Sequence, residues 1–252
     1  MNSEKGEFDN YSSSAYVTNA HNKGLKVWAL CEDMTNDFDE YALFSSSENR
    51  KNFINNLVNA TLAAGADGIN IDFEKIGKKT GPHFVQFLRE LSIETKKNGL
   101  VLSADNYQQN QGNLYYNLGE QGLVCDYVII MDYDEHWAGS QEAGSVASIG
   151  FVERGIASAL EAGVPPYKLI NGVPFYTRLW REEGDRISSN ALGMNEAKEW
   201  VNNRNLTPVI DEETGQYYVT CQDGTAVYEM WLEEATSMSA KLTVGKNNNI
   251  AG

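Results

Sequence analysis

The stretch Asp67-Gly68-Ile69-Asn70-Ile71-Asp72-Phe73-Glu74 decides the fold prediction for this chain, because its residues alternate between apolar and polar. In a strand the apolar residues would point to one face and the polar ones to the other: Asn70, Asp72 and Glu74. Same-face neighbours lie about 7 Å apart, so the three polar groups would converge in a line. Asp and Asn are depleted in strands, and such a conflict is typical of a functional site. A half-exposed strand with one wet face is the alternative.

Composition narrows the classes of function. The chain has 252 residues, 42% of them hydrophobic, which is enough for one sizeable core. Its 35 acidic and 20 basic residues give a formal net charge of −15. Such a field repels nucleic acid and anionic membranes, so neither is predicted as a partner, and a neutral substrate suits it. Three scattered cysteines form no CxxC pair and indicate neither a disulfide framework nor a zinc site: Cys31, Cys125 and Cys221.

Strands and helices alternate on both sides of this stretch, which predicts an α/β fold with a parallel sheet. The expected strands are short apolar runs at residues 26–31, 67–74, 101–104, 127–131 and 169–173. The expected helices are at 12–23, 46–65, 82–99 and 146–162. The alternation of strands and helices ends after residue 173. Residues 177–189 are charged and predicted to be a loop, followed by a helix at 195–203, short strands at 209–210, 216–220 and 225–230, and a helix at 233–246.

Polar residues gather at the carboxyl ends of the expected strands, the edge where parallel α/β folds form active sites. They are Glu74; Asp105, Asn106 and Tyr107; Asp132, Tyr133 and Asp134; and Tyr176 and Arg178. Glycosidic bond cleavage fits this set, since a carboxylic acid with a raised pKa must protonate the leaving oxygen. Glu74 is the candidate acid, and Asp72 supplies a like charge that can raise its pKa. Three tryptophans offer flat faces for sugar rings, although each alone is more often a core residue: Trp137, Trp180 and Trp231.

Three ordered motifs resemble glycoside hydrolase family 18. Residues 67–74 resemble its DGxDxDxE signature, residues 131–134 its MxYD motif, and residues 172–180 its GxPfYxRxW segment. Residues 131–137 and 142–148 are similar to the bacterial spore-cortex and cell-wall N-acetylglucosaminidase branch. The resemblance implies a (β/α)8 TIM barrel with a small α+β insertion. Its parts would be a partial barrel at 1–176, the insertion at 177–231, and a last helix with the start of the final strand at 232–252.

The resemblance also implies a retaining, substrate-assisted mechanism in which the N-acetyl oxygen of the substrate attacks the anomeric carbon. Glu74 would be the acid and then the base, Asp72 would orient the acetamide, and Tyr133 would hydrogen-bond its carbonyl. Further substrate contacts are expected from Asn70, Asp105, Asn106, Met131, Asp134, Trp137, Tyr176, Arg178 and Trp180. No cofactor or metal is implied, and a metal at Asp132, Asp134, Glu135 and His136 is the minor alternative. The implied location is extracellular, in the cell wall or the spore coat or cortex.

The implied partner is a polysaccharide that contains N-acetylglucosamine. The motifs do not separate peptidoglycan from chitin, so a wall-directed glycosidase, a chitinase and an inactive carbohydrate-binding relative remain as alternatives. Intact Glu74 and Asp72 argue against the inactive relative. Asn70 stands where the family commonly has Asp, which removes a carboxylate that can tune Asp72. Because only five of eight barrel strands are recognised, we expect a barrel truncated at both ends, with exposed edge strands at 26–31 and 169–173, that is inactive alone.

Overall fold

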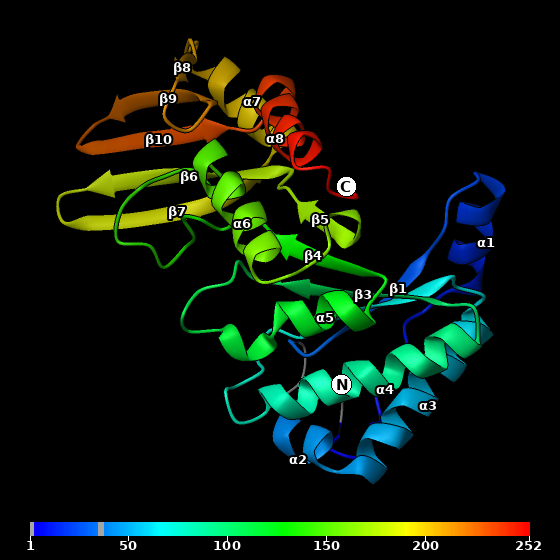
Figure 1. Ribbon diagram of the computed structural model, residues 1–252. Coiled ribbons are helices and arrows are strands. Elements are labelled where there is room, and N and C mark those ends of the chain that lie inside the picture. The colour runs from blue at the N-terminus through cyan, green and yellow to red at the C-terminus, as the bar shows by residue number, and fades with distance from the viewer. Residues whose placement is uncertain (1–2, 35–37) are drawn as a thin grey trace. The chain divides into compact units, whose positions relative to one another are not determined.

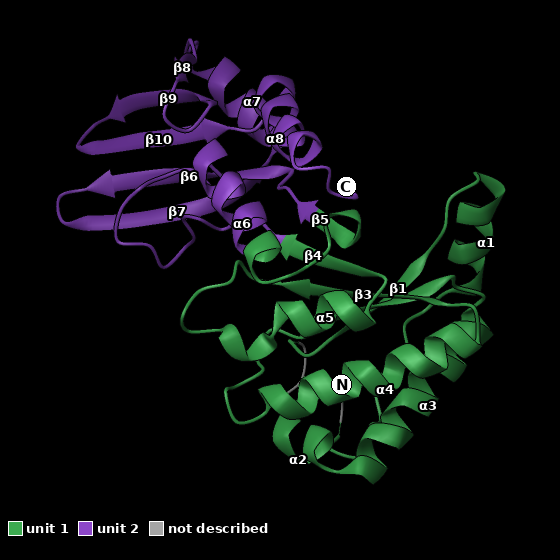
Figure 2. Ribbon diagram, viewed as in Figure 1, with its two compact units in different colours: residues 1–130, 159–170 green, residues 131–158, 171–252 purple. Residues whose placement is uncertain are grey.

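The computed structural model describes residues 3–34 and 38–252 (Figure 1). The chain divides into two compact units. Unit 1 comprises residues 1–130 and 159–170, and unit 2 comprises residues 131–158 and 171–252 (Figure 2). The boundaries expected at residues 176 and 231 are of another kind, because they divide a barrel from an insertion. The division into compact units does not test them, so they stay predictions.

A five-stranded parallel sheet runs in chain order, as consecutive βαβ units arrange it. Its strands are β1 (Trp28–Glu32), β2 (Gly68–Asp72), β3 (Val101–Asn106), β4 (Tyr127–Met131) and β5 (Leu169–Gly172). All five predicted strands are confirmed, with small differences at their ends. The most consequential difference is that β2 ends at Asp72, so Phe73 and Glu74 lie just beyond the strand.

The helices of unit 1 are α1 (Ser14–Asn22), α2 (Glu40–Ser45), α3 (Ser47–Ala64), α4 (Gly81–Lys97) and α5 (Leu118–Val124), with 3-10 turns η1 (Leu114–Tyr116) and η2 (Pro166–Lys168). Helix α3 has the predicted ends: the Ser46 hydroxyl caps it by accepting the Asn49 N–H at 3.2 Å, and Gly65 ends it at φ +76°. The sequence did not predict α2 and α5, because helices of 6 and 7 residues contain too few turns for a periodic pattern.

A cluster of buried phenylalanines forms the centre of unit 1. Its members come from α2, α3, α4 and the residue after β2, and each is at most 2% exposed: Phe44, Phe53, Phe73, Phe84 and Phe87. Burying one such side chain contributes about 1.5–3 kcal/mol. Because Phe73 lies between Asp72 and Glu74 in the sequence, its anchorage in this core fixes the backbone that carries the two carboxylates.

Unit 2 contains an antiparallel sheet in the order β7-β6-β10-β9-β8. Its strands are β6 (Tyr176–Glu183), β7 (Arg186–Gly193), β8 (Val209–Asp211), β9 (Gln216–Asp223) and β10 (Ala226–Leu232). Helices α7 (Met194–Asn203) and α8 (Ala235–Asn247) belong to this unit, and α6 (Ile149–Glu161) begins in it, three residues later than predicted. Within the described residues, no helix has the length and apolar character needed to cross a membrane.

The predicted loop at residues 177–189 is wrong. These residues lie in β6 and β7, which pair as a hairpin from Tyr176 and Gly193 to Glu183 and Arg186. Thr177 and Trp180 of β6 are buried, while the charged residues of this strand that suggested a loop are only partly buried. The two-residue turn Gly184-Asp185, with Gly184 at φ +58°, was the available hairpin signal.

Candidate active site

A buried carboxylate fixes the backbone of Glu74. Asp33 follows β1 and is 0% exposed. One Asp33 oxygen accepts the Glu74 N–H at 2.9 Å, and the other accepts the Lys75 N–H at 3.0 Å. Together with the burial of Phe73, these two hydrogen bonds hold the chain at the end of β2. Sequence reasoning missed Asp33, although it also lies at the carboxyl end of a strand.

Tyr107 is a second residue that the predicted site omitted. It follows β3, and its side-chain hydroxyl donates a hydrogen bond to Glu74 Oε2. The Tyr107 side chain is 47% exposed, so this contact lies at the surface of unit 1. The position of Tyr107 at a strand end was visible in the sequence, but its contact depends on the path of the loop after β3.

Asp72 is half-buried at the end of β2, on the same face as Asn70. Its Oδ1 atom is buried and has no hydrogen-bond partner among the residues described. Burial raises the pKa of the Asp72 carboxyl, and the negative charges of Asp33 and Glu32 raise it further. Asp72 is therefore a carboxylate with a raised pKa. Its Oδ1 atom can accept a hydrogen bond from a ligand.

A chain of hydrogen bonds connects β2 to β3 beside Asp72. The Ser103 hydroxyl donates to Asn70 Oδ1 at 2.5 Å, and the Asn70 amide donates to Asp105 Oδ2 at 2.7 Å. Burial raises the pKa of Asp105 to about 6; the Asn70 hydrogen bond opposes this shift, and the nearby Asp72 charge adds to it. The expected residues Asn70, Asp72 and Asp105 thus form one group.

Asn106, which was expected at the rim, faces a different environment. It is 3% exposed, and its amide exchanges hydrogen bonds with Gln121 at 2.8 and 2.9 Å. Gln121 belongs to α5 and also donates to the Tyr116 carbonyl at 2.9 Å. Asn106 therefore joins β3 to α5, and we leave it out of the proposed substrate contacts.

In unit 2, Tyr133, Asp134 and Tyr176 lie together. The Tyr176 hydroxyl donates to Asp134 Oδ1 at 2.5 Å, and the rings of Tyr133 and Tyr176 meet edge to face with centroids 6.4 Å apart. Asp134 adopts φ +60°, a left-handed conformation that Asp tolerates and that often marks functional positions. Burial and the adjacent Asp134 carboxylate raise the pKa of Tyr176, so its hydroxyl remains a hydrogen-bond donor at neutral pH.

The remaining expected contacts of unit 2 differ in accessibility. Trp137 is 57% exposed, whereas Met131 is 7% and Trp180 is 0% exposed. Arg178 is partly buried, and its Nε–H donates to the Ser189 hydroxyl across the hairpin at 2.8 Å. The Trp180 indole N–H donates to the Gly144 carbonyl at 2.8 Å. Trp180 therefore has no exposed face for a sugar within this unit, and we leave it out of the proposed site.

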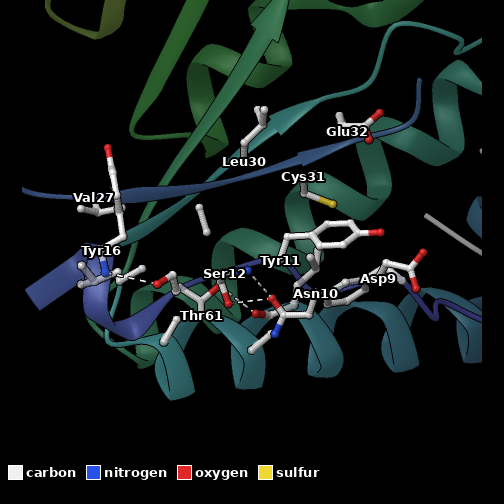
Figure 3. A pocket seen from close by; sticks show the side chains of 18 residues that line it. Asp9, Asn10, Tyr11, Ser12, Tyr16, Val27, Leu30, Cys31, Glu32 and Thr61 are labelled. Carbon is white, nitrogen blue, oxygen red and sulfur yellow. Dashed lines mark hydrogen bonds between the residues drawn. The ribbon is translucent and has the colours of Figure 1, made fainter. Parts of the chain in front are cut away.

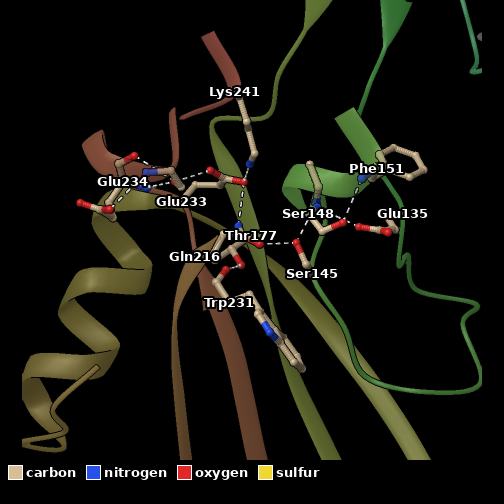
Figure 4. A network of polar contacts seen from close by, with 12 residues as sticks. Glu135, Ser145, Ser148, Phe151, Thr177, Gln216, Trp231, Glu233, Glu234 and Lys241 are labelled. Carbon is tan, nitrogen blue, oxygen red and sulfur yellow. Dashed lines mark hydrogen bonds and ion pairs between the residues drawn. The ribbon is translucent and has the colours of Figure 1, made fainter. Parts of the chain in front are cut away.

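A buried polar network holds the segment 135–148 that follows Tyr133 and Asp134 (Figure 4). The Ser145 hydroxyl donates to Gln216, and the Gln216 amide donates to Glu233 Oε1 at 2.8 Å. Glu233 also pairs with Lys241, and both side chains are at most 1% exposed. Burial raises the pKa of Glu233 and lowers that of Lys241, while their mutual attraction opposes both shifts. The antiparallel sheet and α8 thus anchor this segment.

The acidic cluster weighed as a metal site has other partners. Glu135 accepts the Ser148 N–H at 2.8 Å and pairs with Arg154 at 3.2 Å, while His136 Nδ1 lies 2.9 Å from the Ser145 carbonyl oxygen. No group of three or more His, Cys, Asp or Glu in the described part of the chain is arranged to hold a metal ion. That the reaction needs no cofactor stays a prediction.

A hollow of about 530 Å³ opens elsewhere in unit 1, between residues 8–17, β1 and α3 (Figure 3). Tyr11, Tyr16 and Leu30 are among its lining residues. Its lining includes Glu32 but none of the carboxylates at residues 72, 74 and 105. The hollow is therefore separate from the group formed around Asp72.

Comparisons with known proteins identify relatives along the whole chain. The family model of the glycosyl hydrolases family 18 matches residues 2–252. The sporulation-specific glycosylase YdhD of Bacillus subtilis (strain 168) is 30% identical over 204 residues, which cover 77% of this chain and 47% of that protein. The cortical fragment-lytic enzyme of Bacillus anthracis is 24% identical over 210 residues, covering 79% and 48%. The chain thus spans about half the length of these two relatives.

Solved structures of similar proteins have the same fold as this chain. The crystal structure of YdhD from Bacillus subtilis matches with a TM-score of 0.90 at 25% identity, covering 98% of this chain and 85% of that chain. A chitinase of Ostrinia furnacalis in complex with allosamidin has the same fold, with a TM-score of 0.84 at 20% identity over 99% and 80% of the chains. The predicted fold class is confirmed as α/β, with five parallel strands of a TIM barrel and an α+β insertion. This chain belongs to glycosyl hydrolase family 18, a family of glycosidases.

Proposed function

We propose that the chain is the catalytic part of a retaining glycosidase that cleaves β-1,4 bonds next to N-acetylglucosamine in the peptidoglycan of a spore cortex or cell wall. Family membership supports glycoside hydrolysis on polymers that contain N-acetylglucosamine. The observation that carries the proposal is the pair of carboxylates at the end of β2, where Asp33 and Phe73 fix the backbone of Asp72 and Glu74.

The proposed reaction uses the acetamide of the substrate as nucleophile. Glu74 donates its proton to the glycosidic oxygen while the acetamide oxygen attacks the anomeric carbon and forms an oxazolinium ion. Asp72 accepts a hydrogen bond from the acetamide N–H, and Tyr133 donates one to its oxygen. Glu74, now a carboxylate, then removes a proton from the water that opens the oxazolinium ion. Asp134, Trp137, Tyr176 and Arg178 are proposed to contact the sugars.

The relatives favour peptidoglycan over chitin as the substrate. One relative is named a sporulation-specific glycosylase and another a cortical fragment-lytic enzyme, at 30% and 24% identity. The chitinase-like relatives include a mite allergen, at 21% identity over 78% of this chain. The same comparison supports a location in the spore cortex or cell wall. A chitinase is the second candidate, because the Ostrinia furnacalis chitinase shares the fold.

One experiment separates these candidates. The protein with its barrel completed to eight strands, which is also the parent of every variant below, is incubated with purified cortex peptidoglycan and, in parallel, with chitin oligomers. The products are identified by mass spectrometry. The proposal predicts fragments that end in N-acetylglucosamine from peptidoglycan and slower cleavage of chitin oligomers. Faster turnover of chitin oligomers would assign a chitinase instead. Saturable binding without any product would assign an inactive carbohydrate-binding relative.

The mechanism has its own test. A thiazoline analogue of the oxazolinium ion should inhibit turnover competitively, because it presents the ring that Asp72 and Tyr133 are proposed to contact. Substrates whose acetamide is replaced by a hydroxyl should not be cleaved. Equal cleavage of both substrates would exclude the acetamide as nucleophile.

A further inference from the structure

Asp105 lies beside Asp72 on the neighbouring strand. The strands β2 and β3 pair in register, with Asn70 opposite Ser103 and Ile71 opposite Ala104. The next residue of each strand is Asp72 and Asp105. Paired strands lie about 5 Å apart, so both carboxylates emerge side by side on one face of the sheet. Two carboxylates this close do not ionise independently.

The oxygen atoms of this pair are unevenly satisfied. Asp105 Oδ2 accepts the Asn70 amide at 2.7 Å. Both Asp105 Oδ1 and Asp72 Oδ1 are buried without a hydrogen-bond partner among the described residues. A buried carboxylate oxygen without a donor is costly, whereas a proton held between two carboxylates satisfies both. The Ser103 hydroxyl donates to Asn70 Oδ1 at 2.5 Å and so fixes the orientation of the Asn70 amide. Because that amide donates to Asp105 Oδ2, Asp105 Oδ1 is the oxygen left without a donor.

We propose that Asp105 is a positioning residue that exchanges one proton with Asp72 and thereby sets the charge and orientation of Asp72 at the acetamide. This inference rests on the proposed function. When positive charge develops on the acetamide, the proton stays on Asp105 and Asp72 carries the full negative charge. No other atom is transferred. In this chain the second carboxylate comes from β3, and position 70 of β2 carries an amide instead.

The groups around this pair determine which of the two carboxylates holds the proton. Asp105 faces Asn70 and Asp72 on β2, and its partner on β4 is the uncharged Ile129. Burial and the negative charges of Asp33 and Glu32 raise the pKa of Asp72, so Asp72 gives up the proton when positive charge develops on the acetamide beside it. Burial raises the pKa of Asp105 to about 6, close to the range in which a proton moves readily.

An exchange of the amide and the carboxylate tests the inference. Asp105→Asn keeps the shape of the side chain and can still accept from Asn70, but it cannot exchange a proton. We expect kcat to fall at least tenfold with a much smaller change in KM. The double variant Asn70→Asp/Asp105→Asn returns one carboxylate beside Asp72, and we expect its kcat to recover to within about threefold of the parent.

Two outcomes would overturn the inference. One is an Asp105→Asn variant that keeps more than a third of the parental kcat, since the hydrogen bonds alone would then suffice. The other is a folded double variant that is as slow as Asp105→Asn. Thermal unfolding of each variant reports folding, and carbon-13 NMR of the parental carboxyl groups gives a reading that needs no variant. It should show an aspartate that titrates near pH 6. An ordinary titration of every aspartate would contradict the pair.

The Glu74→Gln variant separates this inference from the proposed function. If Glu74→Gln is inactive and Asp105→Asn is fully active, only the role of Asp105 is wrong. If Glu74→Gln remains active, the proposed function fails irrespective of Asp105.

Discussion

The Tyr107 hydroxyl donates a hydrogen bond to the Glu74 carboxylate, so a residue from the loop after β3 contacts the candidate acid after β2. Glu74 is therefore held at two points, its backbone by Asp33 and its side chain by Tyr107. A general acid must keep its position during proton transfer. The positioning of its carboxyl group contributes to the catalytic rate, as does the pKa of that group.

Tyr107→Phe should lower kcat about tenfold, because a hydrogen bond to a charged group contributes roughly 1.5–3 kcal/mol. The loss should be smaller for substrates with a phenolic leaving group, since these need less help from the acid. Steady-state kinetics on both kinds of substrate measure the difference. Tyr167→Phe, at a side chain that is 70% exposed in η2, is the matched control. An equal loss on both substrates would argue against a contact with the acid.

Lys241→Met should destabilise unit 2 by about 3–5 kcal/mol, because it leaves the buried carboxylate of Glu233 without its cation. The side chains of Lys241 and Glu233 are 1% and 0% exposed, so water cannot replace the missing partner. Adding Glu233→Gln should recover part of the free energy of unfolding. Urea denaturation of the parent, the single variant and the double variant measures both effects. A single variant as stable as the parent would show that the pair is not coupled.

Asp67→Asn should lower the melting temperature at neutral pH, and the difference should vanish in acid. The Val27 N–H and His21 each lie 2.8 Å from Asp67 Oδ2, and these hydrogen bonds lower the pKa of Asp67 below its ordinary value of 3.8. The folded state thus favours the carboxylate, and the stabilisation is complete above pH 3.8 and is lost as the pH falls through the lowered pKa. Melting curves between pH 7 and pH 2.5 test this, and a pH-independent difference would contradict it.

Two tryptophans should respond differently to substitution. Trp137→Ala should raise KM about tenfold with little change in stability, because the indole is 57% exposed and is proposed to contact a sugar. Trp180→Phe should instead lower the free energy of unfolding by about 1–3 kcal/mol, because it leaves the buried Gly144 carbonyl without a donor. Kinetics and urea denaturation of both variants give the comparison. A raised KM for a stably folded Trp180→Phe would return Trp180 to the site.

The sequence predicted the parallel sheet well, because its strands are short apolar runs between helices with clear stop signals such as Gly65. It predicted the wrong structure for β6 and β7, because a hairpin that carries many charged residues resembles a loop in sequence. The missed helices α2 and α5 contain too few turns to show a period.

Within the candidate site, the strand pattern correctly placed Asn70 and Asp72 on one face, and strand-end position correctly grouped Asp134 with Tyr176. Position alone could not show which way a side chain turns. Asn106 turns to Gln121, and Tyr107 turns to Glu74, although they are adjacent in the sequence. Such contacts depend on helix α5 and on the loop after β3, which no local pattern encodes.

The most direct test of the central claim is the turnover of peptidoglycan fragments by Glu74→Gln beside the parent protein. Glutamine keeps the shape of the side chain but cannot donate the proton, and general acid catalysis is typically worth 10²–10⁴-fold. The account predicts at least a hundredfold loss of kcat, with binding of an N-acetylglucosamine oligomer within about threefold of the parent by calorimetry. A Glu74→Gln variant that keeps more than about a tenth of the parental kcat would contradict it.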